Sequence, residues 1–190
     1  MKKYLMIFLV PIILFAIGLF IVLPYYQNQQ IIKRYAFTMD SFDGKVSLSD
    51  FKGKFPIVYF GYMDCPDICP TTLTMISQAL HKLSTKDAKK FQLIFISVDP
   101  DRDKVKGLKE YASYFYPTAL GITSNAKYLK KVSVNYGAYY KKIYLKDSKI
   151  NYSVAHTSFI YIMDKTGKLA KRISHSNSVK PVLDALKEML

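Results

Sequence analysis

Both cysteines of the chain lie in one short segment, "YMDCPDICPTTL" (62–73), which joins two different apolar patterns. The preceding run "FPIVYFGY" (55–62) is rich in β-branched and aromatic residues, which predicts a buried strand. After the cysteines, four apolar residues recur at helical spacing: Leu73, Ile76, Leu80 and Leu83. This spacing predicts an amphipathic helix. The fold must therefore join a buried strand to a helix through a loop that carries both thiols.

Strands and helices alternate along the rest of the chain. Further strands are expected at 91–98, 158–164 and 169–174, and further helices at 104–115, 125–135 and 179–190. Asp43-Gly44 predicts an N-terminal β-hairpin within 37–48, and Lys165-Thr166-Gly167 predicts a second hairpin. This order favours an α/β fold, a central mixed sheet flanked by helices. The strand–cysteine loop–helix unit favours the thioredoxin-like form of that fold.

The N-terminus has the pattern of a membrane anchor. No residue from Tyr4 to Ile32 is charged, and the apolar part is long enough to cross the roughly 30 Å hydrocarbon core as a helix. A signal peptide has a shorter apolar region and a small-residue cleavage site, which "LPYYQNQQ" does not offer. We therefore expect an uncleaved anchor at 1–26, a polar tether at 27–36 and one domain at 37–190.

Charge indicates the orientation and the partners of this domain. Lys2 and Lys3 precede the expected span, and positive flanks tend to stay in the cytoplasm. The domain should then lie outside the cytoplasm, in a bacterium on the periplasmic or outer side of the inner membrane. The net charge is +14, but the lysines are spread along the chain and an exported domain meets no DNA. Solvated lysine faces, drawn toward anionic lipid or an acidic protein, are favoured over nucleic-acid binding.

The prolines that follow the two cysteines shape the loop. Proline disfavours the α region in the residue before it, so Cys65 and Cys69 are expected to be extended. Pro70 suits the first position of the helix, with Cys69 at or near the cap. The positive end of that helix favours thiolate over thiol. The loop is therefore set up for thiolate chemistry.

Three uses of the cysteine pair are open. A structural disulfide across so short a loop restrains little of the unfolded chain and stabilises little. A redox pair usually has two residues between its cysteines, whereas Cys65 and Cys69 have three. A metal site needs a further ligand, and two thiolates with an imidazole suit copper or zinc equally well.

Three histidines are candidates for the third ligand. His81 lies about three turns into the helix and cannot fold back to the cysteines. His175, in "ISHSNSVK", has the composition of an exposed turn. His156 immediately precedes a predicted core strand, and in a thioredoxin-like sheet the loop entering that strand faces the cysteine loop. His156 is therefore the expected third ligand.

The motifs together resemble the Sco/SenC family of membrane-anchored copper proteins. The resemblance rests on three segments, in the family's order and spacing over roughly residues 35–190: "YFGYMDCPDICPTTL", "ISVDPDRD" and "YSVAHTSFIYIMDKTGK". It implies a thioredoxin-like fold that binds one copper, as Cu(I) or Cu(II), through Cys65, Cys69 and His156. It also implies that the protein supplies copper to a respiratory haem–copper (cytochrome c) oxidase. The partners would be the copper-site subunit of that oxidase and other periplasmic copper or thiol-redox proteins.

The chain departs from the family at residues next to the site. The family commonly has Asp-His-Ser where this chain has Ala155-His156-Thr157, and loss of a neighbouring carboxylate alters how an imidazole is oriented. Asp99 is a candidate outer-sphere partner, with a helix or turn cap as the alternative. Asp67 is a second candidate, with capping of the following helix as its alternative.

Two functions therefore stand at this point. The leading hypothesis is an anchored copper-binding protein that passes its ion to an acceptor by ligand exchange. The runner-up is a thiol–disulfide oxidoreductase, with Cys65 and Cys69 as catalytic residues, that reduces the acceptor's cysteines before copper insertion.

Overall fold

The computed structural model describes residues 2–146 and 151–190, and for residues 2–14 it describes the backbone alone. The chain divides into two compact units, Met1–Arg34 and Tyr35–Leu190. The first unit is helical, and its helix α1 (Lys2–Tyr35) continues through residues 27–35 of the expected tether. The side chains of the first half of the expected anchor lie outside the described residues. Within the described part of the chain, no helix combines the length and hydropathy that crossing a membrane requires.

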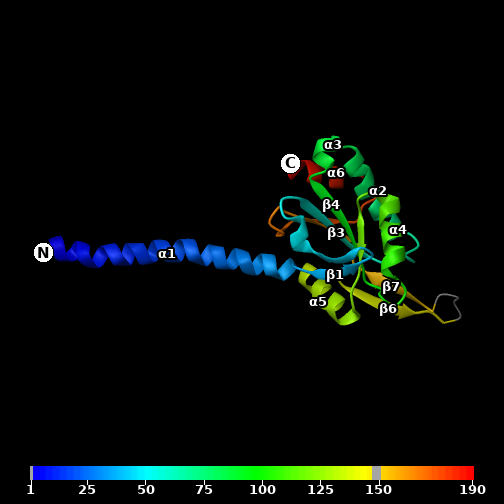
Figure 1. Cartoon of the computed structure of the whole chain (residues 1–190), viewed down its shortest axis with the longest axis horizontal. Coiled ribbons are helices and arrows are strands. Elements are labelled where there is room, and N and C mark those ends of the chain that lie inside the picture. The colour runs from blue at the N-terminus through cyan, green and yellow to red at the C-terminus, as the bar shows by residue number, and fades with distance from the viewer. Residues whose placement is uncertain (1, 147–150) are drawn as a thin grey trace. The chain divides into compact units, whose positions relative to one another are not determined.

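The second unit is built on a five-stranded mixed sheet (Figure 1). Its strands, in spatial order, are β5 (Leu120–Ile122), β4 (Phe91–Ser97), β3 (Phe55–Gly61), β8 (Phe159–Met163) and β9 (Leu169–Ser174). Strands β3, β4 and β5 run parallel, and β8 and β9 are antiparallel to their neighbours. The two central strands β3 and β4 are buried along their whole length, because helices cover both faces.

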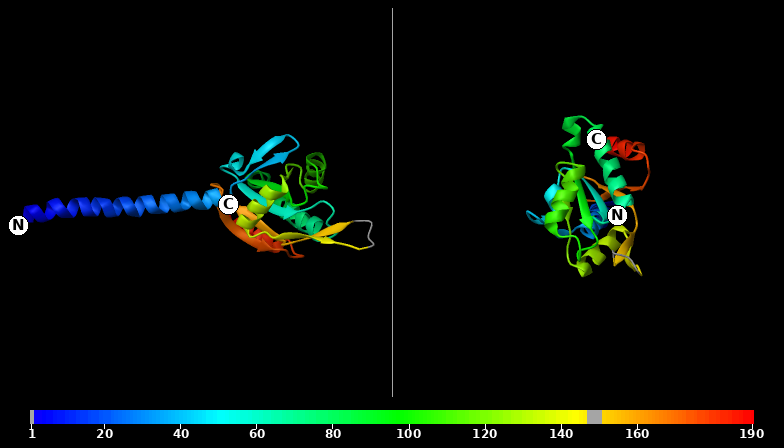
Figure 2. Two further views of the ribbon diagram at one scale, coloured as in Figure 1. Left: turned by 90° about the horizontal axis from the view of Figure 1, so that it is seen from below. Right: turned by 90° about the vertical axis from the view of Figure 1, so that its right-hand side faces the viewer.

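Two separate ribbons accompany the sheet. One is the expected N-terminal hairpin, formed by β1 (Thr38–Ser41) and β2 (Gly44–Ser47). The other is formed by β6 (Tyr140–Tyr144) and β7 (Tyr152–His156), and it extends away from the five-stranded sheet (Figure 2). The β6–β7 ribbon was not predicted from the sequence.

The helices lie between the strands as the alternating pattern predicted. Their bounds are η1 (Leu48–Phe51), α2 (Ile68–His81), α3 (Thr85–Ala88), α4 (Val105–Phe115), α5 (Ala126–Tyr136) and α6 (Lys180–Glu188). Strand β3 shows how they divide between the faces. Tyr59 faces Cys69 of α2, whereas Phe60 meets Tyr136 of α5 edge-on at 5.2 Å between ring centroids. The fold is the α/β thioredoxin-like arrangement, with the cysteine loop between β3 and α2.

Candidate metal centre

The two cysteines lie at the connection between β3 and α2. Cys69 is fully buried in the first turn of α2, and Cys65 is partly exposed in the loop before it. The backbone N–H of Cys69 points at Cys65 and donates to its Sγ at 3.4 Å. Helix N-termini present such unpaired N–H groups, which stabilise an anion. The loop therefore places Cys65 at the positive end of the helix, as the sequence predicted.

The helix begins earlier than the prolines indicated. It starts at Ile68, so Pro70 is its third residue and Cys69 its second. The expectations that Pro70 opens the helix and that Cys69 is extended are therefore wrong. A proline in the first turn removes an N–H that has no intrahelical partner, so the helix tolerates it at this position. Burial of Cys69 outweighs the bias that a following proline imposes on its backbone.

His156 approaches the thiols from the β6–β7 ribbon. It is the last residue of β7, where it pairs with Tyr140, and the core strand β8 begins three residues later. Its Nε2 lies 3.3 Å from Cys69 Sγ. Its Nδ1 lies 3.0 Å from the carbonyl oxygen of Thr157, which can only accept a hydrogen bond. The proton of the neutral ring is therefore on Nδ1, and Nε2 presents its lone pair to the thiols.

The three side chains form one cluster of donor atoms. The ligand atoms of Cys65, Cys69 and His156 all lie within 4.8 Å of one another. The rings of Tyr59 and Tyr62 meet the imidazole edge-on, at centroid distances of 6.4 and 5.8 Å. Two thiolates and an imidazole make a soft donor set that suits copper or zinc. The three donor atoms are already close enough together to bind one metal ion.

The two thiols differ strongly in acidity. A hydrogen bond from the Cys69 side chain lowers the pKa of Cys65 to about 3, and the backbone N–H groups of Asp67 and Cys69 act in the same direction. The Cys65 thiolate and burial raise the pKa of Cys69 far above its usual range. One negative charge is therefore held on Cys65, while Cys69 keeps its proton until something displaces it. A metal cation held by Cys65, Cys69 and His156 would favour the thiolate form of Cys69 and so release this second proton to solvent.

The other residues singled out in the sequence have their own partners. Asp67 occupies the N-cap position of α2, but its side chain accepts no capping hydrogen bond from the helix backbone; its Oδ1 accepts instead from Thr71 Oγ1 at 3.1 Å. Asp99 is fully buried after β4 and binds Arg102 Nε at 2.5 Å and Tyr152 OH at 2.8 Å. These contacts join neither carboxylate directly to a ligand atom.

The other two histidines are engaged elsewhere. His81 Nδ1 bonds the carbonyl of Ser77 at 2.8 Å, and His175 Nδ1 lies 2.8 Å from Thr72 Oγ1. Of the three histidines, the structure brings His156 to the cysteines. The sequence predicted this placement of His156, and its role as a ligand stays a prediction.

Several contributors to the site were not predicted. The alternation of β3 carried a signal for Tyr59, because every second residue of a strand shares one face. The Thr157 carbonyl that fixes the imidazole had no signal, since every residue carries a backbone carbonyl. Arg102 was visible only as one charged residue among many in the sequence.

Comparison with known proteins gives a consistent result. The SCO1/SenC family model matches residues 24–190. An SCO2-like protein of Rickettsia conorii is 34% identical over 146 residues, covering 76% of this chain and 71% of that protein. The apo Sco1 protein of Thermus thermophilus superposes with a TM-score of 0.74 at 32% identity, covering 82% of this chain and 91% of that one. Bradyrhizobium japonicum ScoI, solved with copper bound, gives a TM-score of 0.71 at 36% identity over 82% and 98% of the two chains.

Proposed function

Since the chain belongs to the SCO1/SenC family, we propose that it is a membrane-anchored protein that binds one copper ion and delivers it to the copper site of a respiratory haem–copper oxidase. Sco proteins take part in the copper assembly of cytochrome c oxidase, and several solved relatives contain copper. The observation that carries the proposal is the Cys65–Cys69–His156 cluster, whose ligand atoms lie within 4.8 Å of one another.

The donor set suits both oxidation states of copper. Two thiolates favour Cu(I), and the imidazole supports the higher coordination number of Cu(II). Cys65 supplies a thiolate before the metal arrives, whereas Cys69 must lose its proton as the metal binds. An oxidoreductase would need the two thiols alone, so the imidazole 3.3 Å from Cys69 favours metal binding.

Transfer to the acceptor would proceed by ligand exchange. Cys65 is the more exposed of the two thiols, so it is the ligand that an incoming acceptor cysteine can replace first. Cys69 and His156 would hold the ion until the acceptor supplies further ligands. The acceptor is the copper-site subunit of the oxidase, and other periplasmic copper or thiol-redox proteins would load or reduce the site.

The uncharged N-terminal stretch would hold the domain at the membrane. Residues 4–32 carry no charge, and helix α1 includes them. With Lys2 and Lys3 on the cytoplasmic side, the domain would face the periplasm or the outer surface of a bacterial inner membrane. Accessibility of the domain to an added protease in spheroplasts, but not in inverted vesicles, tests this orientation.

The function is tested by copper titration of the reduced full-length chain in detergent, with a competing chelator. The expected stoichiometry is about one Cu(I) per chain, lost when Cys65 and Cys69 are both replaced by serine. Transfer is then followed to the purified copper-domain subunit of an oxidase. Binding that survives the double substitution, or bound copper that never leaves for the acceptor, would contradict the proposal.

A further inference from the structure

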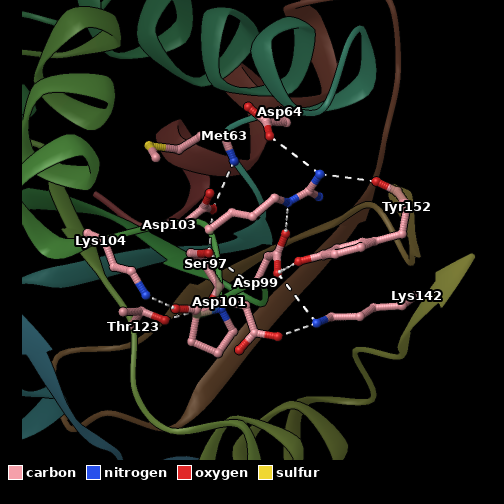
Figure 3. Close-up of polar contacts among 12 residues, drawn as sticks. Met63, Asp64, Ser97, Asp99, Asp101, Asp103, Lys104, Thr123, Lys142 and Tyr152 are labelled. Atoms are coloured by element: carbon pink, nitrogen blue, oxygen red, sulfur yellow. Dashed lines mark hydrogen bonds and ion pairs between the residues drawn. The ribbon is translucent and has the colours of Figure 1, made fainter. Parts of the chain in front are cut away.

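The loop after β4, residues 99–103 (the Asp99–Asp103 loop), contacts both segments that carry the ligand residues. One segment is the β6–β7 ribbon, which ends in His156, and the other is the loop before Cys65. Figure 3 shows Tyr152 and Lys142 of the ribbon pointing toward Asp99, with Met63 and Asp64 on another side of the same loop. The inference that follows rests on the proposed function.

The ribbon is fastened to this loop mainly through Tyr152. The Tyr152 hydroxyl donates to Asp99 Oδ1 at 2.8 Å, and Arg102 Nη1 donates to the Tyr152 carbonyl at 3.0 Å. The Arg102 guanidinium also lies 4.0 Å from the centroid of the Tyr152 ring. Lys142, on the partner strand β6, pairs with Asp101 and lies 4.0 Å from Asp99. Tyr152 and His156 are the first and last residues of the same strand, so these contacts hold the strand that presents the imidazole.

The segment before Cys65 also contacts the Asp99–Asp103 loop. Asp103 Oδ2 accepts the backbone N–H of Met63 at 2.9 Å. Arg102 Nη1 lies 3.4 Å from Asp64 Oδ2, and Asp64 directly precedes Cys65 in the chain. The guanidinium also lies 5.7 Å from the ring of Tyr62, which itself meets the His156 ring. Arg102 is thus the residue whose side chain reaches both ligand-bearing segments.

The contacts among Asp99, Arg102 and Tyr152 are chemically suited to hold the ribbon rigidly. Asp99 is fully buried, and a buried carboxylate is tolerated only when charged partners and hydrogen bonds satisfy it. Arg102 meets this demand with a planar guanidinium, whose Nε binds Asp99 while Nη1 binds the Tyr152 carbonyl. Because the two donors are rigidly connected, the carboxylate and the strand are held at a fixed separation.

We propose that Arg102 is a positioning residue that sets the distance between the His156 imidazole and the two thiols. It touches no ligand atom and acts through Tyr152 on one side and Asp64 on the other. Cu(I) is held chiefly by the thiolates, which α2 and its preceding loop position together. Cu(II) needs the imidazole as well, so a loosened ribbon should weaken Cu(II) selectively.

Two variants separate this role from a loss of charge or of folding. Arg102→Lys keeps the positive charge but cannot bind Asp99 and the Tyr152 carbonyl with one planar group. Tyr152→Phe keeps the ring beneath the guanidinium and removes the hydroxyl that donates to Asp99 and interacts with Lys142. Lys45→Met is the matched control, because it removes an exposed ion pair with Asp40 in the β1–β2 hairpin. Full-length variants in detergent would be titrated with Cu(I) and, separately, with Cu(II).

The expected result is a loss of Cu(II) affinity while Cu(I) affinity stays unchanged. Cu(II) affinity should fall by roughly ten- to a hundredfold in Arg102→Lys, the usual cost of removing a residue that orients a ligand. Tyr152→Phe should show a smaller loss in the same direction, while Cu(I) affinity and the Lys45→Met control stay close to wild type. Equal losses of Cu(I) and Cu(II), or no loss of either, would overturn the proposal.

Amide hydrogen exchange on the metal-free protein gives a second readout. The amides of β7 should exchange faster in Arg102→Lys than in wild type, and those of β3 at the same rate. Wild-type exchange at β7 would overturn the positioning role. If the wild-type protein binds no copper, the proposed function fails, and exchange at β7 then decides the positioning role alone.

Discussion

Cys69 Sγ lies 3.3 Å from His156 Nε2, although 87 positions separate the two residues in the chain. The sheet explains their meeting. Strands β3 and β8 are antiparallel neighbours, so the residues that follow β3 lie at the same edge as those that precede β8. The cysteine loop follows β3, and His156 precedes β8. The topology therefore brings two thiols and an imidazole together.

A histidine scan should single out His156. His156→Ala removes the ring that faces Cys69 and should weaken Cu(II) binding by at least about tenfold, since even residues that only orient ligands cost that much. His81→Ala and His175→Ala remove side chains bonded to Ser77 and Thr72, and should leave Cu(II) affinity near wild type. Competition titrations of the three variants measure this, and equal effects in all three would contradict the assigned ligand.

Cys65 should react as a thiolate well below neutral pH. Its pKa is lowered to about 3, chiefly by the hydrogen bond from the Cys69 side chain, which Cys69→Ala removes. Alkylation of the reduced, metal-free protein by iodoacetamide, mapped by mass spectrometry, should therefore be nearly independent of pH between about 5 and 8. In Cys69→Ala the pKa should move back up toward about 8.5, and the rate should fall about tenfold per pH unit below it.

The same shift has a consequence for stability. The fold favours the Cys65 thiolate. Between the folded pKa of about 3 and the unfolded pKa of about 8.5, the unfolded chain therefore binds more protons than the folded one. The contribution of Cys65 to stability is complete above the unfolded pKa of about 8.5 and is lost as the pH falls toward the folded value. A rate of Cys65 alkylation that falls steadily below pH 8 in the wild type would contradict the lowered pKa on which both predictions depend.

Gly61 should be intolerant of a side chain. A Cβ there would lie 2.7 Å from Cys69 Sγ and 2.8 Å from Phe95 Cε2, so Gly61→Ala must displace the buried thiol or the ring. We expect a loss of about 2 kcal/mol in the free energy of unfolding, together with weaker copper binding. Gly107→Ala is the matched control, because its Cβ would meet only the flexible end of Met63 at 3.2 Å. Urea unfolding measures both variants, and equal losses would contradict the packing argument.

Asp103 should act through hydrogen bonding rather than through its charge. Its Oδ2 accepts from Met63 N–H and from Ser97 Oγ at 2.6 Å, and burial raises its pKa. Asp103→Asn keeps an acceptor in place and should change the free energy of unfolding by no more than about 1 kcal/mol. Asp103→Ala leaves both donors without that acceptor and should cost about 3 kcal/mol. Urea unfolding distinguishes the two, and equal costs would contradict the assignment.

Local patterns in the sequence predicted the central sheet and most helices because burial imposes a strong period on them. The β6–β7 ribbon escaped prediction because both strands are partly exposed and β6 carries two adjacent lysines, Lys141 and Lys142. Strand β5 has only three residues, too few for a periodic signal. His156 was identifiable because it stands just before a recognisable core strand.

The contacts around the ligands were harder to predict. Asp99 was noticed, but its partner Tyr152 lies 53 positions away on the unpredicted ribbon. Pairings of that kind depend on the tertiary structure and leave no local pattern. The tautomer of His156 likewise depends on a backbone carbonyl, which the sequence does not distinguish from any other.

The most direct test of the central claim is X-ray absorption spectroscopy at the copper edge, on Cu(II)-loaded wild type and His156→Ala in detergent. The account predicts two sulfur ligands and an imidazole in the wild type, with the imidazole scattering lost and the sulfurs kept in His156→Ala. Imidazole scattering that persists in His156→Ala, or a copper without sulfur ligands in the wild type, would contradict it.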